Sequence, residues 1–420
     1  MKKYASSCLY FRWVRCICIV LAVQFTFIAN ATAKPVVIGY LPAFRAMTEA
    51  VDKADSKLVT HINISFLNPD ANGILIKNDT MVCMPDIAGA ATTTSAFRYV
   101  VNKAQAAGVK VLVSVAGGVI PSCSGDWSTL LQPSHRQNVI DNLIKFVDEF
   151  NLDGLDIDIE GEVLTKIDKA GNYTPFIQSL SEKLKARNKL LTCATASYEG
   201  GMIPVSSIPY FDFVNIMSYD MIGPSWGVPG VEHSTYAQAV ADVNLWKNRG
   251  LSKERLVLGV PFYGYGFGTY ATNYAYKDII AGFGAESSDK DLIGNACAGC
   301  SYITYNGIST IKNKTRLALQ NGAGVMIWEL TQDAAGSASL LKTINTELQQ
   351  TSNTSSNSLA SSSPNSFSVA TTNENQPSKA SGGALGSLDF LLFIFVFSGF
   401  FLRRQLGIDA PAQRVKKSSV

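Results

Sequence analysis

Eight short apolar runs, separated by stretches with helical periodicity, constrain the fold of this 420-residue chain more than any other feature. Each run has the length of a buried strand, and stretches 136–150, 175–187 and 235–249 carry apolar residues on one helical face. The predicted strands are Val36–Leu41, Ile62–Leu67, Lys110–Val115, Gly154–Ile159, Leu190–Ala196, Phe213–Met217, Leu256–Val260 and Val325–Trp328. Strands that alternate with helices in this way predict an α/β fold, a closed (β/α)8 TIM barrel.

A doubly wound open sheet is the alternative fold. Such a sheet usually has a glycine-rich phosphate-binding turn after its first strand. Here the first strand contains Gly39-Tyr40-Leu41-Pro42, which lacks that pattern. The barrel is therefore the preferred prediction.

The fourth predicted strand has one acidic face. Residues 153–160 have the sequence Asp-Gly-Leu-Asp-Ile-Asp-Ile-Glu, so in a strand Asp156, Asp158 and Glu160 point to one side and three apolar residues to the other. Inside a barrel, carboxylates about 6.6 Å apart would titrate as a coupled set, with at least one raised pKa. A carboxylic acid that stays protonated near neutral pH suits general acid catalysis. The alternative is an exposed edge strand with a solvated acidic face.

The position of these acids along the strand suggests which one meets a ligand. Active sites of such barrels lie at the C-terminal ends of the strands. Glu160 is at that end, and Asp158 and Asp156 lie progressively deeper. We therefore expect Glu160 to contact the ligand and the two aspartates to support it.

Several motifs resemble those of glycoside hydrolase family 18, the chitinase family. Residues 153–160 fit the family's DxxDxDxE signature in full. Motifs of the third, sixth, seventh and eighth strands are similar to Val113–Gly118, in which Ala116 alters the spacing, and to Met217–Asp220, Leu258–Gly264 and Val325–Glu329. Gly39-Tyr40 and His61–Phe66 fit the first two strands, and the resemblance covers roughly residues 35–345.

The resemblance implies a role for each matching residue. Glu160 would protonate the glycosidic oxygen, Asp158 would turn the substrate acetamide towards C1, and Asp156 would share a proton with Asp158. Tyr219 would hydrogen-bond the acetamide, and Trp328 would form an apolar floor under the sugar. For Tyr219 and Trp328, packing in the core is the alternative role.

Further residues are expected around these groups. The resemblance implies that the cleft is also lined by Tyr40, Phe66, Met217, Asp220 and Trp226. Ser114 and Asp153 are expected to support the acids from behind.

The implied activity is retaining hydrolysis of β-1,4 bonds in chitin or chitooligosaccharides, with the substrate's acetamide as nucleophile. No cofactor is implied, and His61, His135 and His233 lack metal-ligand spacing, so no metal is expected. One alternative is an endo-β-N-acetylglucosaminidase acting on the chitobiose core of N-glycans. The other is a carbohydrate-binding protein without activity, which Glu160 disfavours because lectin-like members typically lack that acid.

Two departures from the family pattern affect the expected cleft. Val119 stands where the family often has a tryptophan. The stretch between the seventh and eighth strands looks too short for the full α+β insertion that deepens the cleft in some members. We therefore expect a shallow, open groove, which favours internal (endo) cleavage.

Composition restricts the class of partner. The chain is 47% hydrophobic and 16% charged, which supports a sizeable core. Its formal net charge is +3, and no basic block occurs in the middle of the chain, so nucleic acid is not an expected partner. We expect a monomer.

The ends of the chain look like targeting segments around a single catalytic domain, 34–348. Residues 1–33 have the basic start, apolar run and Ala-Thr-Ala end of a signal peptide, with a retained membrane anchor as the alternative. Residues 349–380 are rich in Ser, Thr and Asn and predict a disordered linker. Residues 381–404 combine Gly-Gly, an apolar run and Arg-Arg, which resembles a bacterial sorting signal; a short membrane anchor is the alternative.

A basic tail, 405–420, completes the chain. These segments predict an exported protein, extracellular or at the cell surface of a Gram-negative bacterium. Cysteine pairing fits that compartment. We expect a Cys83–Cys123 disulfide, a local Cys297–Cys300 disulfide rather than a redox pair, and a buried free thiol at Cys193.

Overall fold

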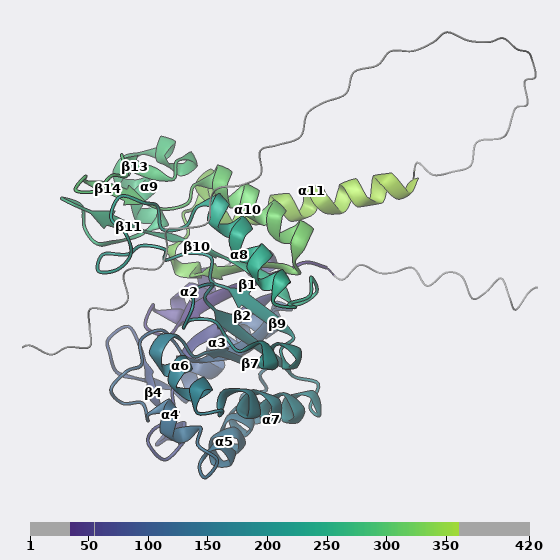
Figure 1. Ribbon diagram of the computed structural model, residues 1–420. Coiled ribbons are helices and arrows are strands. Elements are labelled where there is room, and N and C mark those ends of the chain that lie inside the picture. The colour runs from purple at the N-terminus through teal and green to yellow at the C-terminus, as the bar shows by residue number, and fades with distance from the viewer. Residues whose placement is uncertain (1–33, 54, 361–420) are drawn as a thin grey trace, which may run out of the picture. The chain divides into compact units, whose positions relative to one another are not determined.

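The computed structural model describes residues 34–53 and 55–360, and its centre is a closed barrel of eight parallel strands (Figure 1). The strands follow the order β1-β15-β10-β9-β8-β7-β6-β2 around the barrel. The (β/α)8 prediction is confirmed. The strands are β1 (Val36–Pro42), β2 (His61–Leu67), β6 (Lys110–Ala116), β7 (Gly154–Asp158), β8 (Leu190–Thr195), β9 (Phe213–Ile216), β10 (Leu256–Pro261) and β15 (Gly324–Trp328).

Helices connect the barrel strands and cover their outer faces. The α-helices are α2 (Met47–Lys53), α3 (Thr94–Ala106), α4 (Trp127–Leu130), α5 (Arg136–Glu149), α6 (Gly161–Lys169), α7 (Tyr173–Lys185), α8 (Tyr236–Asn248), α9 (Tyr276–Phe283), α10 (Ile308–Asn321) and α11 (Leu340–Ala360). Short 3-10 helices occupy Ser56–Leu58, Val205–Tyr210, Ala285–Asp289, Leu330–Gln332 and Gly336–Ala338. The three helices predicted from apolar periodicity correspond to α5, α7 and α8.

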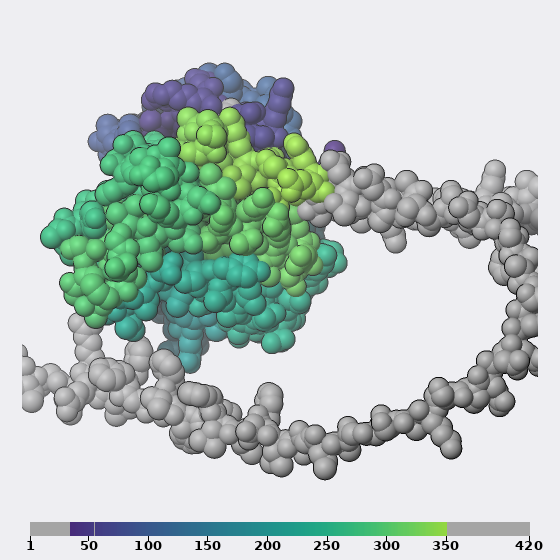
Figure 2. Space-filling view, turned by 90° about the horizontal axis from the view of Figure 1, so that it is seen from above, coloured from purple at the N-terminus to yellow at the C-terminus, as the bar shows by residue number. Residues whose placement is uncertain are grey.

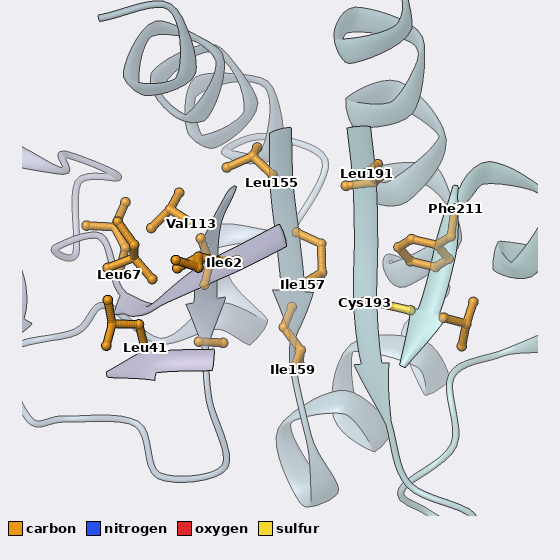
Figure 3. Packing of buried hydrophobic residues seen from close by; sticks show 14 of the residues in the cluster. Leu41, Ile62, Leu67, Val113, Leu155, Ile157, Ile159, Leu191, Cys193 and Phe211 are labelled. Atoms are coloured by element: carbon orange, nitrogen blue, oxygen red, sulfur yellow. The ribbon is translucent and has the colours of Figure 1, made fainter. Parts of the chain in front are cut away.

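Strand β7 divides its side chains between two environments. Leu155, Ile157 and Ile159 belong to the main buried cluster, next to residues such as Leu191 and Cys193 of β8 (Figure 3). Asp156 and Asp158 are buried on the other side, within the barrel. The period-two alternation of the sequence therefore puts apolar residues under the helices and carboxylates inside the barrel.

An insertion of 4 antiparallel strands and one helix follows β10. The sheet order is β12-β11-β14-β13, with β11 (Tyr263–Phe267), β12 (Asn273–Ala275), β13 (Leu292–Gly294) and β14 (Tyr302–Thr304), and α9 lies between β12 and β13. The insertion is visible beside α10 in Figure 1 and as part of the green surface in Figure 2. This segment was expected to be too short for the full α+β insertion of some family members; it nevertheless forms a small α+β unit, in which three of the four strands have only three residues.

A second small sheet lies between β2 and α3. Its strands are β3 (Ile76–Lys77), β4 (Thr80–Pro85) and β5 (Ala91–Thr93). Cys83 of β4 is bonded to Cys123, and Cys297 is bonded to Cys300. Cys193 is a buried free thiol.

Helix α11 continues to Ala360, so the first part of the segment predicted as a disordered linker, 349–380, is helical. Four predicted segments lie outside the described residues: the signal peptide 1–33, the remainder of the linker, the segment 381–404 and the tail 405–420. Across the described part of the chain, the structure contains no helix long and apolar enough to cross a membrane.

Candidate active site

Asp156 lies at the centre of a hydrogen-bond network inside the barrel. Its carboxylate accepts hydrogen bonds from Tyr40 Oη (2.6 Å), Ser114 Oγ (2.7 Å) and Thr192 Oγ1 (2.5 Å), and a longer one from Asn215 Nδ2 (3.4 Å). The barrel register brings these groups together, because Asp156 stands beside Ser114 of β6 and Thr192 of β8. Burial raises the pKa of Asp156, and the hydrogen bonds oppose that rise.

Asp158 and Glu160 form a hydrogen-bonded carboxyl pair at the C-terminal end of β7. Burial, followed by the charges of Glu160 and Asp156, raises the pKa of Asp158 well above its usual value. Burial also raises the pKa of Glu160, to about 7. The hydrogen bond from Asp158 opposes this rise, and the negative charge of Asp220 adds to it. The pair therefore retains at least one proton at neutral pH, as an acid catalyst requires.

Three aromatic side chains form a floor at the mouth of the barrel. Phe66 and Trp328 stack with ring centroids 5.5 Å apart and planes at 16°, and Tyr40 lies 5.4 Å from Trp328. Met217 and Tyr219 pack against the same inner cluster. Among the predicted lining residues, Tyr40, Phe66, Met217 and Trp328 are therefore brought together with Tyr219.

Asp220 and Trp226 lie on the loop that follows β9. Tyr263 Oη donates to Asp220 Oδ1 (2.5 Å), and Trp226 Nε1 donates to the backbone oxygen of Asp220 (3.0 Å). Trp226 is 46% exposed and packs edge-on against Tyr265 of the insertion. Trp226 therefore stands at the rim of the site rather than in its floor.

A groove of about 1070 Å³ borders the site through Asp220 and Trp328, and Asp156, Asp158 and Glu160 are not among its lining residues. The groove continues along β11 and β12 of the insertion on one side and along α2 on the other. The insertion therefore forms a wall of the groove.

Asp153 does not support the acids, and that prediction is wrong. It precedes β7 at the amino end of the strand, where its Oδ2 accepts hydrogen bonds from the backbone N–H of Val111 (2.8 Å) and from Gln105 Nε2 (3.0 Å). Its side chain links β6 and β7 at the end of the barrel away from Glu160. Ser114, by contrast, contacts Asp156 directly, as predicted.

Several residues of the site were not predicted. Thr192 and Asn215 are polar positions within mostly apolar strands, and that interruption is a signal that could have identified them. Gly118 is another site residue that was not predicted as such. It lies against the acid, since a Cβ at this position would be 2.8 Å from Glu160 Oε1. Tyr263 comes from the insertion, and no local pattern in the sequence points to its contact with Asp220.

The site combines a proton-retaining carboxyl pair with an aromatic surface. An apolar ring face packs the less polar side of a pyranose, and a protonated carboxylic acid can donate to a leaving oxygen. Within residues 34–53 and 55–360, no cluster of His, Cys, Asp and Glu has the arrangement of a metal site. Acid catalysis at a sugar bond is the chemistry that these groups support.

The fold and these groups define a glycoside hydrolase. The chain belongs to glycoside hydrolase family 18, since the family model "Glycosyl hydrolases family 18" matches residues 36–333. Among solved structures, the family 18 chitinase ChiB of Flavobacterium johnsoniae is 34% identical, with a TM-score of 0.64 and coverage of 76% of this chain and 95% of that one. A chitinase from Bacteroides thetaiotaomicron is 31% identical, with a TM-score of 0.63 and coverage of 76% and 97%.

The chain is also similar to a plant protein over much of its length. The class V chitinase of Arabidopsis thaliana is 25% identical over 334 residues, which is 69% of this chain and 84% of that protein.

Proposed function

We propose that the protein is a retaining, endo-acting chitinase that cuts β-1,4 bonds between N-acetylglucosamine units with the substrate's acetamide as nucleophile. The observation that carries the proposal is the Asp158–Glu160 pair, whose raised pKa values keep a proton at the end of β7, beside the aromatic floor. The likeness to two bacterial chitinases at 34% and 31% identity supports the substrate class.

Glu160 is the proposed proton donor in the first step. It transfers its proton to the glycosidic oxygen while the bond from that oxygen to C1 breaks. The acetamide carbonyl oxygen of the same sugar attacks C1 from the opposite side, so the enzyme need not supply its own nucleophile. In the second step the Glu160 carboxylate accepts a proton from water as water attacks C1 and the bond between C1 and the acetamide oxygen breaks, which regenerates the acetamide and restores the starting configuration.

Asp158 is the proposed partner of the acetamide. Its Oδ1 is buried and makes no hydrogen bond to the described part of the chain, so it is available to the acetamide N–H. An acceptor placed there would orient the carbonyl oxygen towards C1. Asp156, held by Tyr40, Ser114 and Thr192, is positioned to share the proton that Asp158 gives up.

A product profile tests the proposal directly. The full chain, incubated with N-acetylglucosamine pentamer and with colloidal chitin, should release internal cleavage products in the β configuration. Glu160→Gln should lower kcat by about 10²–10⁴-fold while the far-ultraviolet circular dichroism stays the same. A glycoprotein with high-mannose N-glycans serves as the second substrate.

Two outcomes would contradict the proposal. Release of N-glycans without cleavage of the pentamer would favour the endo-β-N-acetylglucosaminidase alternative. Equal activity of the wild type and Glu160→Gln would remove Glu160 from the role of acid.

We also propose export, to the cell surface or the medium. The disulfides Cys83–Cys123 and Cys297–Cys300 support this location, because such bonds persist in oxidising compartments. The signal peptide predicted from residues 1–33 supports it from the sequence. The test is the intact mass of protein recovered from the culture medium, compared with the masses calculated with and without residues 1–33 and 381–420. Absence of the protein from both the medium and the cell surface would contradict export.

A further inference from the structure

His233 lies directly behind Asp220 and is completely buried. It precedes α8, and its backbone is held from two sides: its N–H donates to Thr304 Oγ1 of β14 (3.1 Å), and its carbonyl accepts from Met221 N (3.0 Å). Met221 is the neighbour of Asp220 in the chain. The imidazole is therefore fixed between the insertion and the loop that carries Asp220.

The imidazole faces a carboxylate without bonding to it. His233 Nδ1 lies 3.7 Å from Asp220 Oδ1, and neither ring nitrogen makes a hydrogen bond within the described residues. The rings of Tyr263 and Tyr265 lie 5.3 Å away and leave the imidazole no access to solvent. A buried polar group without a partner costs about 1–3 kcal/mol, so a partner in the working state is expected.

Asp220 connects this imidazole to the chemistry. Its Oδ1 already accepts from Tyr263 Oη, and its backbone is in the left-handed region with φ 65°. Its side chain is 39% exposed and lines the groove. Its negative charge is also one of the causes that raise the pKa of Glu160. The position of the Asp220 carboxylate therefore affects the pKa of Glu160.

We propose that His233 is a positioning residue, which donates from Nδ1 to Asp220 when a sugar occupies the site and so fixes that carboxylate beside Glu160. The inference rests on the glycosidase function proposed above. Catalytic hydrogen bonds are often long in unliganded sites and shorten in the substrate complex. Here a movement of about 0.8 Å would bring 3.7 Å to an ordinary hydrogen-bond length.

Burial favours the neutral form of His233, whose Nδ1–H tautomer can donate to Asp220. Burial lowers the pKa of His233, and the contact with Asp220 and its charge oppose that effect; the charge of Lys314 lowers the pKa further, and the charge of Asp291 raises it. Two other titratable side chains, Tyr263 and Tyr265, pack their rings 5.3 Å from the imidazole. Lys314 of α10 is buried and holds Ser234, the next residue, through its carbonyl (2.8 Å) and its Oγ (2.6 Å).

Two substitutions distinguish a role of His233 as a hydrogen-bond donor from a role in filling space. His233→Asn keeps an N–H donor near the position of Nδ1, whereas His233→Leu fills a similar volume without a donor. We expect His233→Leu to lower kcat on the N-acetylglucosamine pentamer by about 10-fold, the scale of one lost hydrogen bond, with little change in KM. His233→Asn should recover most of that loss at a similar Tm. Equal losses in the two variants would overturn the proposal.

A double-mutant cycle tests whether His233 acts through Asp220. In the Asp220→Asn background, adding His233→Leu should change kcat less than 2-fold, because the carboxylate that it positions is gone. The pH–rate profile should follow the same pattern, with a shift of the basic limb in His233→Leu but no further shift in the double variant. A full 10-fold effect in the Asp220→Asn background would show that His233 acts only on the fold.

A spectroscopic test does not depend on activity. The chain has only 3 histidines, so ¹⁵N imidazole signals can be assigned with His233→Asn. With the pentamer bound in the Glu160→Gln background, Asp220→Asn should move the His233 signals more than those of His61 and His135. An unchanged His233 signal in that complex would overturn the proposed contact. If the wild type cuts no pentamer while the signal does shift, the proposed function fails and the contact stands.

Discussion

At the residue scale, the buried Asp158–Glu160 pair sets the expected pH dependence of hydrolysis. Burial raises the pKa of Glu160 to about 7, and an acid catalyst works only while protonated. We therefore expect kcat/KM on a soluble oligomer to fall by about 10-fold per pH unit above pH 7. Asp220→Asn, which removes a charge that raises this pKa, should move the basic limb to lower pH. A basic limb near pH 5 would contradict the assignment.

The same raised pKa predicts a pH-dependent cost to stability. The folded protein holds the Glu160 proton more tightly than the unfolded chain, whose reference value is 4.5. The stabilising contribution of this group is therefore fully present below pH 4.5 and is lost as the pH rises through about 7. At pH 4, Glu160→Gln and the wild type should unfold at similar urea concentrations. At pH 8, the free energy of unfolding of Glu160→Gln should exceed that of the wild type by about 1–3 kcal/mol. A stability difference that does not change with pH would refute this linkage.

At the element scale, the turn after β6 is shaped to leave room for the acid. A Cβ on Gly118 would lie 2.8 Å from Glu160 Oε1, the far end of a flexible side chain. Gly118→Ala should therefore displace the acid at little cost to the fold, with kcat/KM lower by about 10–100-fold and a small change in Tm. The matched control is Gly282→Ala in α9, where a Cβ meets nothing within 4 Å and activity should be unchanged. Full activity of Gly118→Ala would contradict the turn's role.

The elements themselves differ in how far the sequence predicts them. The barrel strand Gly154–Asp158 alternates in sequence because its two buried faces differ, one packing under helices and the other inside the barrel. Helices such as Arg136–Glu149 have apolar periodicity because they bury one face. The insertion gives no such signal: β12, β13 and β14 have three residues each, too few for an alternation to stand out. Helix α11 continues into Ser- and Asn-rich sequence, whose composition predicts a disordered linker rather than a helix.

At the scale of the whole molecule, barrel closure decides which residues meet. Asp156 and Glu160 could be predicted because one strand carries them with a period of two. Among the partners of Asp156, Thr192 and Asn215 lie 36 and 59 residues away in sequence and were not predicted, and Tyr40, 116 residues away, was expected only from the family resemblance. His233 and Tyr263 reach the site only through the insertion and its neighbouring loop. The sequence pattern of one strand therefore identifies the acid, whereas the residues that shift its pKa come together only when the barrel closes.

The two disulfides should stabilise the molecule unequally, because they close loops of very different length. Cys83 and Cys123 are 40 residues apart, whereas Cys297 and Cys300 are 3 apart. Loop-closure entropy predicts a loss of about 4 kcal/mol for Cys83→Ala/Cys123→Ala and less than about 2 kcal/mol for Cys297→Ala/Cys300→Ala. Urea unfolding of both double variants, with the oxidised wild type as the reference, measures the difference. Equal losses would show that the long cross-link does not act through the unfolded chain, and a larger loss in the short loop would reverse the predicted order.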